Sequence, residues 1–287
     1  MKDTNLREHM DMPDPTFPMK VLRCESIDKG MVTPSHWHEH MELLLIKKGK
    51  AHIQCNKNGI YVVKGSLVLV NCNDIHSVEN MCSDLLFECI IIDMSLLKSS
   101  FMDSTQTKFI DPVINNNIIF KNDITGDRTI IKCLENVIME YRQKNFGYEL
   151  AIKAGLFEFI THLMRNHIDR MLTPQECDAR IRTLQRFKAV FEYVEENYSE
   201  NITVKDISRV ANLSPYYFCR LFKETTGRSF VDFLNSFRIN KAEQILRETD
   251  MNITETALAC GFNDINYFSR MFKRYKSMPP SSLRIKR

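Results

Sequence analysis

The sequence YFCRLFK at residues 217–223 returns almost unchanged as YFSRMFK at residues 267–273. Each copy follows a stretch with helical spacing of its apolar residues, VKDISRVANLS before the first and ITETALACGFND before the second. Between the copies, residues 230–249 have the apolar spacing of one long helix. The pattern therefore predicts a unit of helix, tight turn and helix that occurs twice, with a long helix holding the two units apart.

Helix-start signals support this division of the C-terminal third. Thr203 with Asp206 has the spacing of a capping box, and so does Asn252 with Glu255. Ser214, which is followed by a proline, has the features of an N-cap residue before a first helical turn. The predicted helices span residues 184–198, 204–211, 215–226, 230–248, 253–260, 265–276 and 279–284.

The side chains outside the apolar face of the second helix in each unit have the chemistry of DNA recognition. A helix-turn-helix places this helix in the major groove, where Arg can donate two hydrogen bonds to guanine and Asn to adenine, while Lys suits phosphate. Core packing of the repeated phenylalanines is the alternative explanation, but packing does not require the repeat to preserve Arg and Lys as well. We expect Arg220 and Arg270 to read bases. The full set of candidate DNA-binding residues is Tyr216, Tyr217, Cys219, Arg220, Lys223, Ile265, Asn266, Ser269, Arg270 and Lys273.

Residues 184–285 resemble the DNA-binding domain of the AraC/XylS transcription regulators. The matching segments are SPYYFCRLFKETTGRSF, FRINKAEQIL, ITETALACGF, NYFSRMFK and PPSSLR. The resemblance implies two helix-turn-helix units that read adjacent major-groove segments on one face of the DNA. The positions that it assigns to base contact are Tyr216, Cys219, Arg220, Asn266, Ser269 and Arg270. Two departures are mild: Ser208 stands where the family commonly has alanine, and Phe230 where it commonly has proline.

The N-terminal part carries the segment HWHEHME at residues 36–42. Short apolar runs between residues 30 and 95 predict several strands in a barrel or sandwich. If this segment lies on one strand, its three histidines and Glu42 share a face, and His76 approaches from a later strand. The spacing of these residues resembles the two motifs of the cupin barrel, with asparagines in the second motif where proline and glycine are usual.

Three imidazoles and one carboxylate suit a divalent transition metal, and the candidate metal ligands are His36, His38, Glu42 and His76. Regulators of the resembled family usually carry a cupin that binds a small molecule, often a sugar, without acting as metalloenzymes. We therefore expect a small-molecule effector of the sugar or metabolite class, no obligatory cofactor and no catalysis. A metal-binding cupin sensor or a metalloenzyme fused to a DNA-binding domain is the alternative. The candidate effector-binding residues are His36, Trp37, His38, His40, Glu42 and His76.

These patterns together predict an α+β chain of two domains. Residues 1–127 are expected to form an N-terminal arm and a cupin-like ligand-sensing barrel, and residues 128–168 a helical hairpin. Residues 169–183 read as a polar linker, and residues 184–287 as an all-α AraC-type DNA-binding domain with two helix-turn-helix units. The hairpin either packs on the barrel or forms a two-fold seam, and we expect a homodimer. The other expected partners are double-stranded DNA and the effector, and contact with RNA polymerase stays open.

The charge distribution is compatible with a polyanion partner, and a solvated basic surface would explain it as well. Residues 183–287 contain 17 Lys and Arg against 12 Asp and Glu, whereas the rest of the chain contains 22 against 24. The nine cysteines form no CxxC pair, so we expect free thiols in a reducing compartment. The polar, proline-broken N-terminal sequence has no secretion signal, and no apolar run could span a membrane. We therefore expect a cytoplasmic location.

Overall fold

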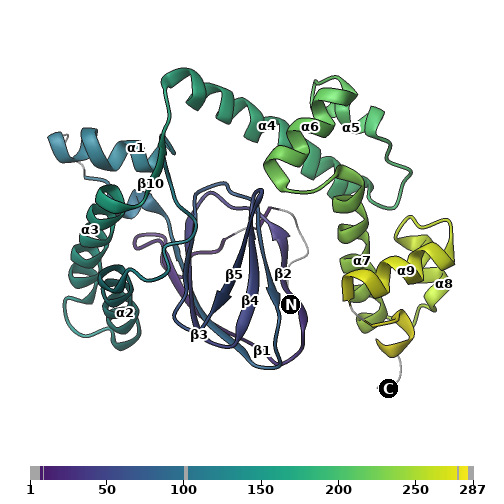
Figure 1. Cartoon of the computed structure of the whole chain (residues 1–287), viewed down its shortest axis with the longest axis horizontal. Helices are drawn as coiled ribbons and strands as arrows, with labels where there is room; N and C mark the ends of the chain where they lie inside the picture. Colours follow the sequence, from purple (N-terminus) through teal and green to yellow (C-terminus); the bar gives the residue numbers. More distant parts are fainter. Residues whose placement is uncertain (1–6, 9, 100–102, 277, 284–287) are drawn as a thin grey trace.

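The computed structural model describes residues 7, 8, 10–99, 103–276 and 278–283. An N-terminal β-sandwich with a helical hairpin on one side is joined by a long helix to a C-terminal group of helices (Figure 1). The ends of the predicted domain ranges, residues 1–6 and 284–287, lie outside the described residues. None of the described helices is both long and apolar enough to cross a membrane.

The sandwich consists of two four-stranded antiparallel sheets, ordered β1-β8-β3-β6 and β2-β7-β4-β5. Hydrogen bonds pair the described strands within each sheet, so the cupin-like fold is an open sandwich rather than the closed barrel that the sequence suggested. The strands are β1 (Met19–Ser26), β2 (Gly30–His36), β3 (Met41–Lys48), β4 (Lys50–Cys55), β5 (Asn58–Val63), β6 (Leu67–Val70), β7 (His76–Asn80) and β8 (Leu85–Ile92).

The first sheet is buried on both of its faces. One face of β3 and β8, with residues such as Leu44 and Phe87, packs against the second sheet. The other face, with residues such as Leu43 and Ile90, packs against the helices α2 (Arg128–Gln143) and α3 (Tyr148–Asn166). This double burial explains why apolar residues fill adjacent positions of both strands instead of alternating with polar ones. The predicted helical hairpin is therefore confirmed, with its inner face on the sandwich.

Short elements connect the sandwich to this hairpin and the hairpin to the C-terminal helices. The 3-10 helix η1 (Met94–Leu97), the π-helix η2 (Gln106–Ile110) and α1 (Asp111–Ile114) precede a two-stranded sheet. That sheet pairs β9 (Ile118–Phe120) with β10 (Ile168–Met171), so it joins the chain before α2 to the chain after α3.

The stretch predicted as a linker, residues 169–183, consists largely of regular secondary structure. Most of this stretch belongs to β10 and to the first part of α4 (Pro174–Asn197), a continuous helix that enters the C-terminal domain. The proline that suggested a break is the first residue of that helix, where a missing N–H costs nothing. Thr173 and Glu176 form a capping box around it.

The C-terminal helices follow the predicted repeat closely. After α4 come α5 (Val204–Val210), α6 (Pro215–Thr226), α7 (Phe230–Glu248), α8 (Ile253–Ala259), α9 (Ile265–Lys276) and η3 (Pro280–Leu283). Capping boxes start α5 and α8, and Ser214 caps α6, as the sequence predicted. Two helix-turn-helix units, α5–α6 and α8–α9, are thus joined by the long helix α7 (Figure 1).

Candidate ligand site and nucleic-acid interface

Four of the predicted residues converge inside the sandwich. The ligand atoms of His36, His38, Glu42 and His76 all lie within 4.8 Å of one another, and all four side chains are buried. His36 at the end of β2 is directly paired with His76 at the start of β7. Glu42 reaches the same point from β3, which belongs to the facing sheet. The site therefore joins the two sheets.

The HWHEHME segment does not lie on one strand, which corrects the expectation of alternate faces. Strand β2 ends at His36 and β3 begins at Met41, and residues 37–40 carry the chain from one sheet to the other. Nδ1 of His38 lies 3.2 Å from the carbonyl oxygen of His40 and holds this turn. The two histidines and the glutamate still converge because the turn brings them back to one point.

Each of the three imidazoles is held by a backbone carbonyl at its Nδ1 atom. His36 contacts the carbonyl oxygen of Pro34 at 2.9 Å, and His76 that of Asp74 at 2.9 Å. A carbonyl oxygen only accepts, so the hydrogen of each neutral ring resides on Nδ1, and Nε2 presents a lone pair. The Nε2 atoms of His38 and His76 both lie 2.9 Å from Oε2 of Glu42. Either a proton on Nε2 or a cation has to lie between these acceptors.

Burial and charge act in opposite directions on these groups. Burial alone would raise the pKa of Glu42, but His76 and His38 outweigh it and hold this pKa well below its ordinary value. Burial lowers the pKa of His38, whereas Glu42 outweighs burial at His76 and raises that pKa. Glu42 is therefore a carboxylate, ready to pair with positive charge.

The site also includes two residues that the sequence did not predict, Cys89 and Glu8. Sγ of Cys89 on β8 donates to Oε1 of Glu42 at 3.0 Å, and burial raises the pKa of this thiol well above its ordinary value. A carboxylate oxygen of Glu8 lies 2.9 Å from Nε2 of His36. Neither residue has a sequence signal, because Cys89 sits in a mostly apolar strand and Glu8 in a polar segment far from the motifs.

The donor set fits a divalent transition metal. Three Nε2 atoms and one carboxylate oxygen are the ligands that zinc, iron, manganese and nickel accept in proteins. The backbone carbonyls that accept from Nδ1 fix the orientation of each ring, as partners of metal-ligating histidines commonly do. The geometry can therefore accommodate a divalent cation between the Nε2 atoms and Glu42, in the place that a proton on Nε2 would otherwise take.

Two of the predicted effector-binding residues lie outside this group. Trp37 is buried in a hydrophobic cluster whose other members, apart from Ile75, come from the C-terminal helices. His40 is half-buried, and its Nε2 lies 3.9 Å from a carboxylate oxygen of Asp93. The converging set is therefore smaller than the predicted one.

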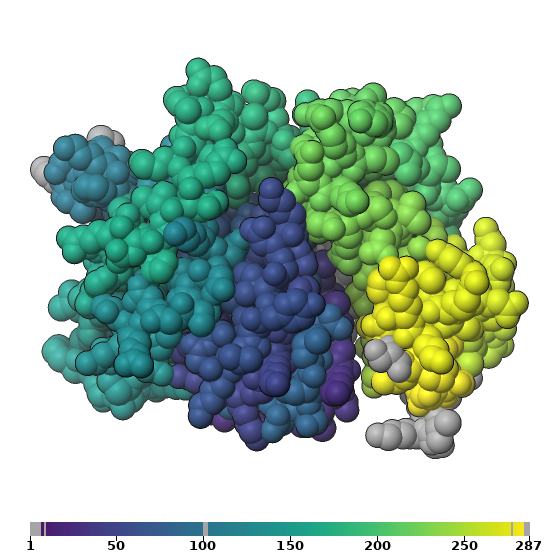
Figure 2. Space-filling view, viewed as in Figure 1, coloured from purple at the N-terminus to yellow at the C-terminus, as the bar shows by residue number. Residues whose placement is uncertain are grey.

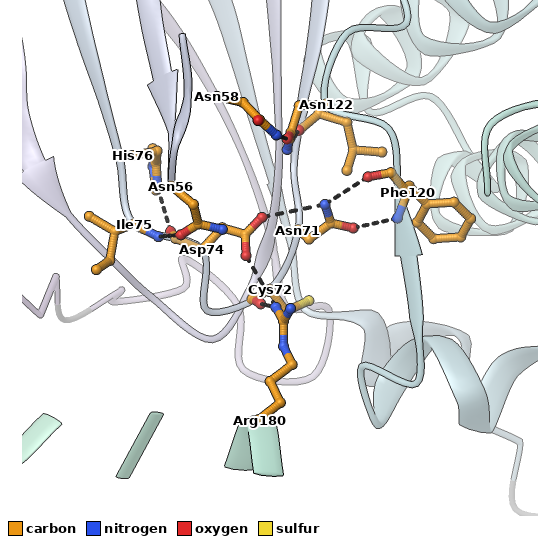
Figure 3. A network of polar contacts seen from close by, with 11 residues as sticks. Asn56, Asn58, Asn71, Cys72, Asp74, Ile75, His76, Phe120, Asn122 and Arg180 are labelled. Carbon is orange, nitrogen blue, oxygen red and sulfur yellow. Dashed lines mark hydrogen bonds and ion pairs between the residues drawn. The ribbon is translucent and has the colours of Figure 1, made fainter. Parts of the chain in front are cut away.

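The loop before His76 connects the site to the helix α4. Arg180 donates to the Asp74 carboxylate at 3.1 Å and to the carbonyl oxygen of Cys72 at 3.3 Å (Figure 3). Asn71 holds the same loop through two hydrogen bonds to the backbone of Phe120. The loop that positions His76 is thus held by α4, the helix that connects the two domains.

The second helices of the two repeats, α6 and α9, present the predicted DNA-binding side chains to solvent. All ten candidates except Ser269 are exposed, and Ser269 is half-buried. The guanidinium of Arg220 lies 5.2 Å from the ring of Tyr217, and that of Arg270 lies 5.7 Å from the ring of Tyr267. Stacking on an aromatic ring reduces the freedom of each arginine before it meets a ligand.

Fold and sites together define a protein that joins a ligand-binding β domain to a DNA-binding helical domain. A sequence profile for the AraC-like ligand binding domain matches residues 21–160, and a profile for a helix-turn-helix domain matches residues 207–286. The HTH-type transcriptional regulator YdeC of Bacillus subtilis is 25% identical over 288 residues, which cover 98% of this chain and 96% of that protein. The HTH-type transcriptional activator RhaS of Mannheimia succiniciproducens is 22% identical over 262 residues, with coverages of 88% and 90%.

Among solved structures, ToxT from Vibrio cholerae with a bound unsaturated fatty acid is similar at a TM-score of 0.48. It is 17% identical, and the match covers 95% of this chain and 96% of that one. The sequence profiles and the full-length relatives place the chain in the AraC family of transcription regulators. The protein is a DNA-binding transcription regulator controlled by a small-molecule ligand.

Proposed function

We propose that the controlling ligand is a divalent transition metal held by His36, His38, Glu42 and His76. The observation that carries the proposal is the shared orientation of the three imidazoles, whose Nδ1 atoms face backbone carbonyls while two Nε2 atoms converge on one oxygen of Glu42. When bound, the metal would supply a fixed positive charge between the two sheets. This charge would offset the repulsion between the Nε2 lone pairs of the imidazoles and the Glu42 carboxylate.

Elemental analysis of the full chain, dialysed without chelator, tests this proposal. We expect near-stoichiometric metal in the wild-type protein and its loss in a His36→Ala/His38→Ala double variant. A His52→Ala/His162→Ala variant is the matched control, because both of these histidines lie outside the converging group. Absence of metal from wild-type protein that still binds DNA would contradict the proposal and favour an organic effector, with sugars screened first.

We also propose that the ten candidate residues of α6 and α9 form the DNA interface. Their exposure supports this role, as does the equivalent stacking of the two repeated arginines. The basic excess of the C-terminal third would favour approach to the phosphate backbone whatever its sequence. Arg220 and Arg270 would then supply preference for particular bases.

A homodimer through the outer face of the hairpin completes the proposal. The inner face of α2 and α3 is covered by the sandwich, yet Leu150 and Phe157 on α3 and Met139 on α2 remain exposed. Apolar side chains that stay exposed on an otherwise packed hairpin suit a self-complementary surface. Contact with RNA polymerase stays a prediction. The absence of catalysis also stays a prediction, and metal-dependent turnover of a substrate would contradict it.

A further inference from the structure

We propose that Trp37 couples the ligand site to the first helix-turn-helix unit, so that metal binding releases Trp37 from the hydrophobic core of the DNA-binding domain. The inference rests on the proposed metal site and adds its mode of regulation. Two elements of the site take part: the turn that carries Trp37 and the loop that precedes His76.

Residues that dock on the DNA-binding domain are chain neighbours of the proposed ligands. Trp37 lies between His36 and His38, and Ile75 directly precedes His76. Both docking side chains are only 7% exposed, in one hydrophobic cluster with the core of the first helix-turn-helix unit. The space-filling view shows the C-terminal helices against the sandwich (Figure 2). A shift of the ligands therefore moves the docking residues as well.

The segment of residues 7 and 8 connects the site to Trp37 by a second route. The backbone N–H of Glu8 donates to the carbonyl oxygen of Trp37 at 3.0 Å, and the Arg7 guanidinium lies 5.6 Å from the Trp37 ring. The carboxylate of Glu8 meanwhile occupies Nε2 of His36. A metal that takes this nitrogen displaces Glu8 and so loosens the segment that packs on Trp37.

The docked arrangement leaves polar atoms of the interface without partners. Nε1 of Trp37 and Nε of Arg180 are buried and have no hydrogen-bond partner among the described residues. A buried donor without a partner destabilises the state that holds it, and release to water restores its hydrogen bonds. A modest rearrangement at the ligands can therefore shift the docking equilibrium.

A charged contact also holds the first part of α4 against the loop that precedes His76. Arg180 on α4 binds the Asp74 carboxylate, and the carbonyl of Asp74 accepts from Nδ1 of His76 (Figure 3). Two contacts, through Asp74 and Arg180, thus connect the proposed metal ligand His76 to the helix that enters the DNA-binding domain. Loss of the Arg180 contact should favour release, the same direction as metal binding.

Trp37 is the only tryptophan of the 287 residues, so its fluorescence reports docking without labelling. We would titrate the full chain with Zn²⁺ alone and follow the emission maximum and its quenching by acrylamide. We expect a red shift and stronger quenching that saturate at one equivalent, and neither in a Glu42→Gln variant at the same Zn²⁺ concentration. An unchanged or blue-shifted emission, with stoichiometric zinc found by elemental analysis, would overturn the coupling and leave the metal site standing. A chain that binds no metal would overturn both.

If metal binding weakens docking of the two domains, then weaker docking must strengthen metal binding. This reciprocity gives a second test at Arg180, which is not a metal ligand. If docking opposes metal binding, Arg180→Gln should tighten zinc binding by about five-fold or more, as measured by calorimetric titration. Arg170→Gln is the matched control, because Arg170 is also ion-paired near the start of α4 but is exposed. Equal or weaker zinc affinity in Arg180→Gln would contradict the proposal.

Discussion

Carbonyl oxygens of the backbone decide the chemistry of the three imidazoles in the ligand site. Because each Nδ1 is engaged, the protein itself selects the tautomer that directs Nε2 inward. Residue types and spacing were enough to predict the four converging residues. The tautomers, Cys89 and Glu8 could not be predicted, since they depend on backbone positions and on contacts between distant parts of the chain.

The thiol of Cys89 orients the Glu42 carboxylate, which leads to a first prediction. Replacement of Cys89 by Val keeps the apolar volume of the strand but removes the hydrogen bond to Oε1. We expect zinc affinity to fall by about 10-fold to 100-fold, as on loss of other groups that hydrogen-bond to a metal ligand, with little change in the unfolding midpoint. Cys55→Val in the same sandwich interior is the control. Equal zinc affinity for both variants would show that the thiol serves packing alone.

The two repeated arginines lead to a second prediction. Arg220→Ala or Arg270→Ala should cost about 1–3 kcal/mol on the preferred DNA and relax base preference at one position each. Lys223→Ala should instead weaken binding to all sequences and reduce the salt dependence. Binding measured over a set of single-base variants distinguishes the two patterns. Uniform weakening by the arginine variants would make them phosphate contacts.

Helix boundaries in the C-terminal domain were predictable because caps and apolar spacing act locally. Thr203, Ser214 and Asn252 each cap the helix that the sequence assigned to them. The start of α4 was misread because the same proline is compatible with a loop and with a first helical turn. The turn at residues 37–40 was missed because alternation of residue types does not reveal where a strand changes sheet.

The start of α2 gives a third prediction, on stability. Asp127 caps this helix through the backbone N–H groups of Thr129 and Ile130 and contacts Nε2 of His167 at 2.8 Å. The His167 contact is the largest cause that lowers the pKa of Asp127 below its ordinary value of 3.8. A lowered carboxyl pKa stabilises the fold above the unfolded-state value, and this stability is lost as the pH falls through the lowered pKa.

We expect Asp127→Ala to lower the free energy of unfolding by about 1 kcal/mol at neutral pH, as loss of an N-cap does. The difference from wild type should shrink below pH 3.8, which denaturant titrations at several pH values can measure. The exposed Asp169→Ala serves as the control. A difference that persists unchanged into acid would mean that the carboxylate charge is not involved.

In the whole molecule, the hairpin covers one face of the sandwich and the DNA-binding domain docks beside the ligand site. The sequence predicted both domains and the hairpin, because their hydrophobic periods differ. It could not predict the docking, since Trp37 and Ile75 carry no mark of a partner from another domain. Docking of this kind depends on shape across the interface rather than on spacing along the chain.

A fourth prediction concerns assembly. We expect Leu150→Glu/Phe157→Glu to convert a wild-type dimer to a monomer in sedimentation velocity, because both charges would have to be buried in the proposed seam. Tyr61→Glu, at an exposed residue of the sandwich, should leave the dimer intact. A wild-type monomer, or a dimer that survives the double substitution, would contradict the hairpin interface.

The most direct test of metal control is DNA affinity of the full chain with and without metal. A duplex that the protein itself selects from a random library would be the ligand, with affinity measured by fluorescence anisotropy. We expect zinc to change the Kd of the wild-type protein by about five-fold or more and to leave that of Glu42→Gln unchanged. The same wild-type Kd in both conditions, with zinc bound at one equivalent, would contradict this expectation.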